Sequence, residues 1–93
     1  MGEAVKLVRE VIVENDAGMH ARVASMLVQK VKEFSSEVTF RKGKAVARGD
    51  SMIDLLSFGA GKGTHLMLEI SGEDADDAME AITGLFARRF YED

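Results

Sequence analysis

The chain has 93 residues, which predicts one domain over residues 1–93, since single domains usually run to about 50–250 residues. It contains no cysteine and its two histidines lack metal-ligand spacing, which excludes disulfides and thiolate sites and leaves no metal or cofactor to expect. A net charge of −4 argues against nucleic-acid binding, and the lack of a signal-like or membrane-spanning apolar run of about 20 residues favours a soluble, cytoplasmic protein.

The first part of the chain predicts a strand followed by a helix. Val5 to Glu14 alternates, with Val5, Leu7, Val11 and Val13 on one face. After a turn at residues 15–18, apolar residues recur at helical spacing and predict an amphipathic helix from Ala21 to Glu33. Its predicted core residues are Ala24, Leu27, Val28, Val31 and Phe34. This core face excludes His20 and Arg22.

The rest of the chain predicts a hairpin and three further elements. The hairpin joins a strand with Val38 and Phe40 to Ala45–Ala47 through a turn at residues 42–44. A short helix is expected from Met52 to Phe58, and a strand from Thr64 to Ser71 with Leu66, Leu68 and Ile70 facing inward. The last helix is expected from Ala75 to Phe90, with core positions at Ala78, Met79, Ile82, Leu85, Phe86 and Phe90.

The order of elements, βαββαβα, predicts the fold class. It is typical of an α+β open-faced sandwich with a four-stranded, mainly antiparallel sheet and three helices on one face. The other face should meet solvent, as the outward His65, Met67 and Glu69 of the last strand indicate.

His20, directly before the first predicted helix, has three candidate roles: a helix cap, a buried packing residue or a phosphoryl acceptor. The unpaired N–H groups and the positive dipole of a helix start bind anions, and the same potential disfavours a protonated ring. Arg22 can add a guanidinium fork for phosphate oxygens. These features make His20 and Arg22 candidate catalytic groups, with the backbone of Ala21, Arg22 and Val23 stabilising the phosphate.

The segment Gly18-Met19-His20-Ala21-Arg22 resembles the active-centre motif of HPr, the histidine-containing phosphocarrier family of the bacterial phosphoenolpyruvate-dependent phosphotransferase system. The resemblance continues through SSEVT at residues 35–39, SMIDLLSFGAGKG at residues 51–63 and the acidic, then apolar, last helix. It implies that His20 takes a phosphoryl group from enzyme I and passes it to a IIA protein or domain, with Arg22 as the active-centre arginine. The chain would then be a monomeric carrier rather than an enzyme.

Two features leave details of this resemblance open. Val23 stands where the family motif usually has proline, which pre-sets the backbone of the first helical turn, so loop rigidity or partner choice should differ. GMHAR and the ending LFARRFYED are similar to the nitrogen-type branch of the family, whereas residues 51–63 are nearer the sugar and carbon-regulatory branch.

The second helix carries two further candidates. Ser51 aligns with a serine that HPr kinase/phosphorylase modifies in some family members, but it also fits a helix N-cap with Asp54 three positions later. Asp50 and Asp54 would oppose a phosphate there. Met52, Ile53 and Leu56 cannot all be buried in so short a helix, and the resemblance implies that they dock enzyme I and IIA proteins. Leu55 and Phe58 are expected in the core.

Three classes of function are open to a chain of this fold. The first is the phosphoryl carrier. The alternative is a non-carrier regulatory adaptor on the same fold, acting through Met52, Ile53, Leu56 and phospho-Ser51. A nucleic-acid-binding domain is disfavoured by the acidic charge. Gly59 to Thr64 is predicted to be a turn rather than a nucleotide-binding loop, because its spacing is wrong and a strand follows it.

Overall fold

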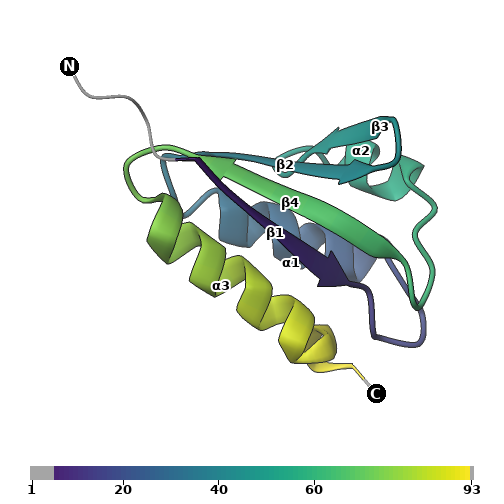
Figure 1. The fold of residues 1–93 in the computed structure, drawn as a ribbon. Coiled ribbons are helices and arrows are strands. Elements are labelled where there is room, and N and C mark those ends of the chain that lie inside the picture. Colours follow the sequence, from purple (N-terminus) through teal and green to yellow (C-terminus); the bar gives the residue numbers. More distant parts are fainter. Residues whose placement is uncertain (1–5, 93) are drawn as a thin grey trace.

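The computed structural model describes residues 6–92 and confirms the predicted order of elements (Figure 1). The strands are β1 (Lys6–Ile12), β2 (Glu37–Lys42), β3 (Ala45–Arg48) and β4 (His65–Ser71). The helices are α1 (Ala21–Val31), α2 (Met52–Ser57) and α3 (Ala75–Ala87), followed by a short 3₁₀ segment, η1 (Arg89–Tyr91). The predicted inward position of Val5 lies outside the described residues.

The four strands form one sheet in the order β1-β4-β2-β3, and each neighbouring pair is antiparallel. The inward residues Leu66, Leu68 and Ile70 of the central strand β4 are buried, as predicted from their alternation. Val38 and Phe40 of β2 lie in register with Ile70 and Leu68 and complete this part of the core. His65 and Met67 point to the open face and are exposed.

The helices cover the apolar face of the sheet. Figure 1 shows α1 and α3 lying along it, and α2 packs against both α1 and β3. The predicted core residues of α1 are buried, with the exception of Phe34, which is half-buried. Within the described residues, no helix has the length and apolar character needed to cross a membrane.

α1 ends at Val31, two residues before the predicted end at Glu33. The backbone tightens there into i→i−3 hydrogen bonds, from Glu33 N–H to the Lys30 carbonyl and from Phe34 N–H to the Val31 carbonyl. The next residues are held by a carboxylate from a different part of the chain. Asp74 accepts hydrogen bonds from the backbone N–H groups of Ser35 and Ser36 at 2.9 and 3.0 Å, and from the Ser36 hydroxyl.

The hydrogen bonds that Asp74 accepts from Ser35 and Ser36 should stabilise the fold at neutral pH and less so in acid. The hydrogen bond from the Ser36 side chain, followed by that from the Ser35 backbone, lowers the pKa of Asp74 below its ordinary value of 3.8. A carboxylate with a lowered pKa in the folded state stabilises the fold fully above that ordinary value and less as the pH falls through the folded-state pKa. Asp74→Ala should therefore lower the melting temperature at neutral pH, and its difference from wild type should shrink below pH 3.8.

The control for this prediction is Asp77→Ala, which removes an exposed carboxylate from the first turn of the same helix. Thermal unfolding of the three proteins across the acid range measures the effect. A difference in melting temperature between wild type and Asp74→Ala that stays constant down to the lowest pH would show that the Asp74 carboxylate does not stabilise the fold through these hydrogen bonds.

The end of α3 differs from the prediction of a helix that continues to Phe90. The helix ends at Ala87, and Arg89, Phe90 and Tyr91 take left-handed backbone conformations with φ of 53°, 54° and 60°. Each such residue other than glycine costs about 1–2 kcal/mol. Phe90 is fully buried, and the centroid of its ring lies 4.8 Å from that of Phe86 in a T-shaped arrangement. Burial of such a side chain contributes about 1.5–3 kcal/mol. The turn directs Glu92 toward the start of α1.

Candidate functional site

The loop between β1 and α1 presents His20 at the N-cap of α1. Gly18 has a φ of 73°, and a Cβ at this position would lie 2.7 Å from the Ala60 carbonyl oxygen, so the close packing of the two loops requires glycine. Met19 N–H donates to the same Ala60 carbonyl at 2.8 Å. Residues 59–63, a turn as predicted, therefore form the support behind the His20 loop.

The ring of His20 acts neither as a helix cap nor as a buried packing residue within the described part of the chain. His20 occupies the N-cap with extended backbone, φ −103° and ψ 179°, but its side chain makes no capping hydrogen bond within the described residues. The side chain is 36% exposed, whereas the neighbouring Met19 is buried. The ring is therefore available at the surface, at the start of the helix.

The first turn of α1 keeps its backbone donors free. The first N–H of the helix to bond a backbone carbonyl is that of Ala24, which donates to the His20 carbonyl at 2.9 Å. Among residues 6–92, the N–H groups of Ala21, Arg22 and Val23 have no hydrogen-bond acceptor. Three free donors at the positive end of a helix dipole favour an anion beside the His20 ring.

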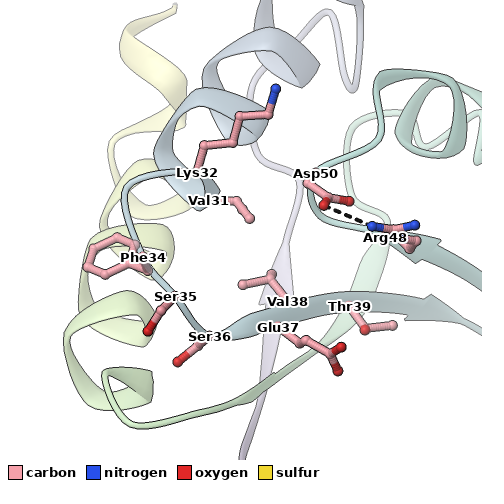
Figure 2. A pocket seen from close by; sticks show the side chains of 10 residues that line it. All are labelled: Val31, Lys32, Phe34, Ser35, Ser36, Glu37, Val38, Thr39, Arg48 and Asp50. Carbon is pink, nitrogen blue, oxygen red and sulfur yellow. Dashed lines mark hydrogen bonds and ion pairs between the residues drawn. The ribbon is translucent and has the colours of Figure 1, made fainter.

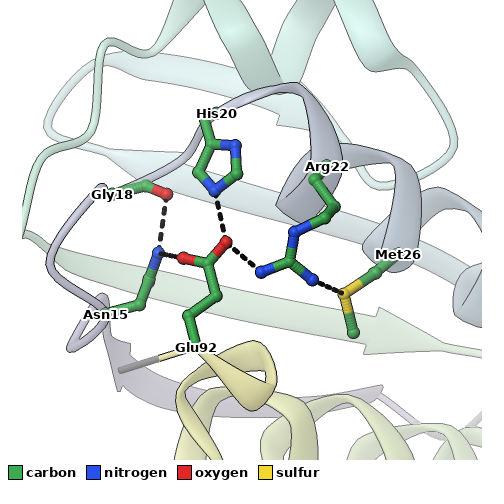
Figure 3. Close-up of polar contacts among 6 residues, drawn as sticks. All are labelled: Asn15, Gly18, His20, Arg22, Met26 and Glu92. Atoms are coloured by element: carbon green, nitrogen blue, oxygen red, sulfur yellow. Dashed lines mark hydrogen bonds and ion pairs between the residues drawn. The ribbon is translucent and has the colours of Figure 1, made fainter.

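Glu92 is the member of this site that the sequence analysis missed. Its Oε2 atom lies 2.5 Å from His20 Nε2 and also accepts a hydrogen bond from the Arg22 guanidinium (Figure 3). Its Oε1 atom accepts a hydrogen bond from Asn15 Nδ2 at 2.8 Å. Residues from the β1–α1 loop, the first turn of α1 and the position after η1 thus meet at the Glu92 carboxylate.

The charge of Glu92 is set by these partners. Burial alone would raise the pKa of Glu92, but hydrogen bonds from Asn15, His20 and Arg22 outweigh it and hold the pKa below its ordinary value of 4.5. Glu92 is therefore ionised at neutral pH. The sequence held one indirect signal for the contact between Glu92 and His20. Phe90, two residues before Glu92, is apolar and therefore expected to be buried, which holds this segment against the core.

Val23, the departure from the family motif, is fully buried in the core. Its N–H has no acceptor in the described part of the chain, so proline would lose no hydrogen bond there. We predict that Val23→Pro is tolerated and stabilises the protein by about 0.4–1 kcal/mol, because proline restricts the unfolded chain. Thermal or denaturant unfolding measures this.

The matched control is Val28→Pro in the middle of α1, where proline should cost about 3 kcal/mol or more. Destabilisation by several kcal/mol in Val23→Pro would show that the first turn of α1 does not have the backbone described here.

Two of the three candidate docking residues on α2 are exposed, as predicted, and the third, Met52, is not. Ile53 and Leu56 are 78% and 40% exposed, whereas Met52 is half-buried and packs against the core. Leu55 and Phe58 are buried. Because α2 packs against α1, the exposed apolar pair belongs to the same helical layer as the helix that His20 begins.

Ser51 is the N-cap of α2, as its sequence context predicts. Its hydroxyl accepts a hydrogen bond from Asp54 N–H at 3.2 Å. The reciprocal half of a capping box is absent from this pair, because the Asp54 carboxylate accepts from Arg48 N–H at 3.0 Å instead. The Ser51 side chain therefore has a structural role at the helix start.

A groove of about 780 Å³ lies away from His20, between the end of α1 and the start of β2 (Figure 2). Its walls include Lys32, Phe34 and the ion pair between Arg48 and Asp50. His20, Arg22 and Glu92 do not line it. His65 is solvent-facing, as predicted, and its Nδ1 lies 3.3 Å from Glu10 across the open face of the sheet.

Comparison with known proteins identifies relatives of this chain. Residues 7–88 match the family model described as "PTS HPr component phosphorylation site". The chain is 42% identical over 86 residues to phosphocarrier protein NPr of Proteus mirabilis, and the match covers 91% of this chain and 96% of that relative. It is 40% identical over 88 residues to phosphocarrier protein HPr of Xylella fastidiosa, and this match covers 94% of this chain and 98% of that relative. A crystal structure of HPr from Thermoanaerobacter tengcongensis superposes with a TM-score of 0.89 at 28% identity, covering 94% of this chain and 98% of the other.

Proposed function

Because the chain belongs to the HPr family of the phosphotransferase system, we propose that it is a cytoplasmic phosphocarrier that works as a monomer and is itself transiently phosphorylated on His20. It takes the phosphoryl group from phospho-enzyme I and passes it to a IIA protein or domain. Relatives named NPr and HPr match at similar identity, so the relay serves either nitrogen and carbon regulation or sugar uptake.

The observation that carries this proposal is the combination of an exposed imidazole and free donors at the start of α1. The N–H groups of Ala21, Arg22 and Val23 are directed along the helix axis toward the position where a phosphoryl group on His20 would carry its charge. The Arg22 side chain is 53% exposed and adds a guanidinium. The surface location lets the ring meet one protein to accept the group and another to donate it.

A two-stage transfer assay tests the function. The chain is incubated with labelled phosphoenolpyruvate and enzyme I, separated from the donor, and then mixed with a IIA protein. The expected result is that the label appears first on the chain and then on the acceptor. Label that never reaches the chain would contradict the carrier and favour an adaptor that binds without transfer.

The partner surface proposed for this function is the exposed pair Ile53 and Leu56 on α2. We predict that Ile53→Glu and Leu56→Glu each weaken binding to enzyme I about tenfold or more, because a charge placed in the apolar centre of an interface loses its hydration without a partner. Titration followed by NMR chemical shifts measures the affinity and shows that the variants remain folded.

The control is Val46→Glu, which adds the same charge at an apolar residue that is 49% exposed on β3. Its affinity for enzyme I should equal that of wild type. Unchanged binding by both α2 variants would place the docking surface on another part of the molecule.

A further inference from the structure

We propose that the outer edge of β1 binds an extended segment of another protein as a fifth strand of the sheet, in a groove between β1 and α3. This segment carries a lysine or arginine that faces the acidic start of α3, and an apolar residue four positions before it. The proposal is independent of the phosphocarrier role, because His20, Arg22 and Glu92 do not line this groove.

β1 is an edge strand of the described sheet. It pairs with β4 on one side, and Figure 1 shows it at the border of the sheet, next to α3. In an antiparallel ladder, alternate residues direct their N–H and C=O groups to the partner strand. Val13, which follows β1, donates to the Thr64 carbonyl at 2.9 Å, and the same alternation therefore points the backbone groups of Val8, Glu10 and Ile12 away from β4. Within residues 6–92 these outward groups have no hydrogen-bond partner.

A groove runs along this free edge, between β1 and α3. It consists of two adjoining hollows of about 420 and 230 Å³, which share Arg9 and Thr83 as lining residues. The first hollow lies beside the start of α3 and reaches Leu7, and the second continues along β1 to Glu14, with Phe86 in its wall. An extended segment can therefore lie beside the whole strand and hydrogen-bond to its outward backbone groups, as in other cases of strand addition.

The wall that α3 provides at the first hollow is acidic. Asp76, Asp77 and Glu80 line it, and all three are exposed. Among residues 6–92 none of these carboxylates forms an ion pair. Arg9 supplies one positive charge on the opposite wall, so three carboxylates face one guanidinium. This excess of negative charge favours a segment with a basic side chain.

The same charge argues against a second copy of this chain as the occupant. Two copies joined through β1 would form one continuous sheet with both α3 helices on the same side, next to each other. The acidic residues of one α3 would then face those of the other, and like charges that meet across an interface oppose its formation. A basic segment that has no helix of its own meets the opposite charge instead.

The groove also sets the spacing of side chains in the bound segment. Every second residue of a strand points to the same face. A residue opposite Leu7 on the helix-facing side would meet the acidic wall, and a residue opposite Val11 would lie beside Phe86. All strand pairs in this sheet are antiparallel, and in that direction the apolar residue precedes the basic residue by four positions.

The test uses the synthetic peptide Thr-Val-Thr-Ser-Thr-Lys-Thr and a control peptide with glutamate in place of the lysine. Each peptide is titrated into protein labelled with nitrogen-15 and followed by NMR. With the lysine peptide, the amide signals of Val8, Glu10 and Ile12 should shift, and their exchange with solvent should slow as these N–H groups become hydrogen-bonded. The glutamate peptide should bind about fivefold more weakly or less, because it replaces a surface ion pair by repulsion.

Two protein variants separate the strand edge from the acidic wall. Val8→Pro removes an outward N–H that has no partner within residues 6–92, so the fold should persist while the affinity falls about tenfold or more. Val8→Ala keeps this N–H and should retain binding. Asp76→Asn combined with Glu80→Gln should weaken binding of the lysine peptide about fivefold. Glu33→Gln combined with Glu37→Gln, which changes two exposed carboxylates outside the groove, should leave it unchanged.

Each outcome decides the proposal. Binding of the lysine peptide at the β1 amides, lost in Val8→Pro and weakened when the acidic wall is neutralised, supports it. No shifts at β1, or equal affinity for the two peptides, would overturn it. Shifts of the β1 amides that grow with protein concentration alone would assign the edge to a second copy and overturn it as well. If Val8→Pro does not fold, the variant of Asp76 and Glu80 still decides, because it leaves the backbone unchanged.

Discussion

His20→Ala is expected to abolish phosphoryl uptake from phospho-enzyme I while leaving the fold intact. The side chain is 36% exposed and lies outside the hydrophobic core, so its removal should change the free energy of unfolding by about 0.5 kcal/mol or less. Arg22 and Asn15 remain to hold the Glu92 carboxylate in the variant. Uptake and the melting temperature are measured on the same preparation.

The other histidine provides the control. His65 is exposed on the open face of the sheet, so His65→Ala should accept one phosphoryl group at the wild-type rate. Uptake by His20→Ala, or loss of uptake in His65→Ala with the fold intact, would remove His20 from the centre of the mechanism.

Arg22→Ala is expected to slow transfer about 100-fold, because a two-pronged contact between a guanidinium and a phosphoryl group contributes about 3 kcal/mol. The stability should change much less. The side chain is 53% exposed, and among residues 6–92 it forms an ion pair with Glu92 and a weak contact with Met26. Single-turnover rates and melting temperatures, measured together, separate the two effects.

Arg48→Ala is the matched control, since Arg48 is also exposed and paired with a carboxylate, that of Asp50. Its transfer rate should equal that of wild type. Equal rates for Arg22→Ala and wild type would show that the arginine near the ring does not contact the phosphoryl group.

The elements of the fold followed from the sequence where the apolar pattern was long and regular. Leu66, Leu68 and Ile70 alternate, and each is buried on the same face of β4. In α1 the residues Ala24, Leu27 and Val28 recur at helical spacing and all lie in the core. His20 and Arg22 could likewise be placed at the start of α1, because they stand outside that spacing.

The ends of the helices and the third residue of the site, Glu92, could not be predicted from the apolar pattern. α1 ends early because Asp74, 38 residues away from Ser36, holds the following loop, and local periodicity carries no information about such a contact. Phe90 fits the apolar spacing of α3, so the pattern predicted a continuing helix. The left-handed turn at residues 89–91 depends on tertiary packing, and with it the position of Glu92.

The most direct test of a phosphocarrier role for His20 is an intact-mass measurement of the wild-type chain after incubation with phosphoenolpyruvate and enzyme I, with the modified residue located by fragmentation. The mass should increase by one phosphoryl group, located on His20 and lost after brief exposure to acid, as expected for a phosphorus–nitrogen bond. An unchanged mass with a donor that phosphorylates a known phosphocarrier, or an acid-stable group on Ser51, would contradict it.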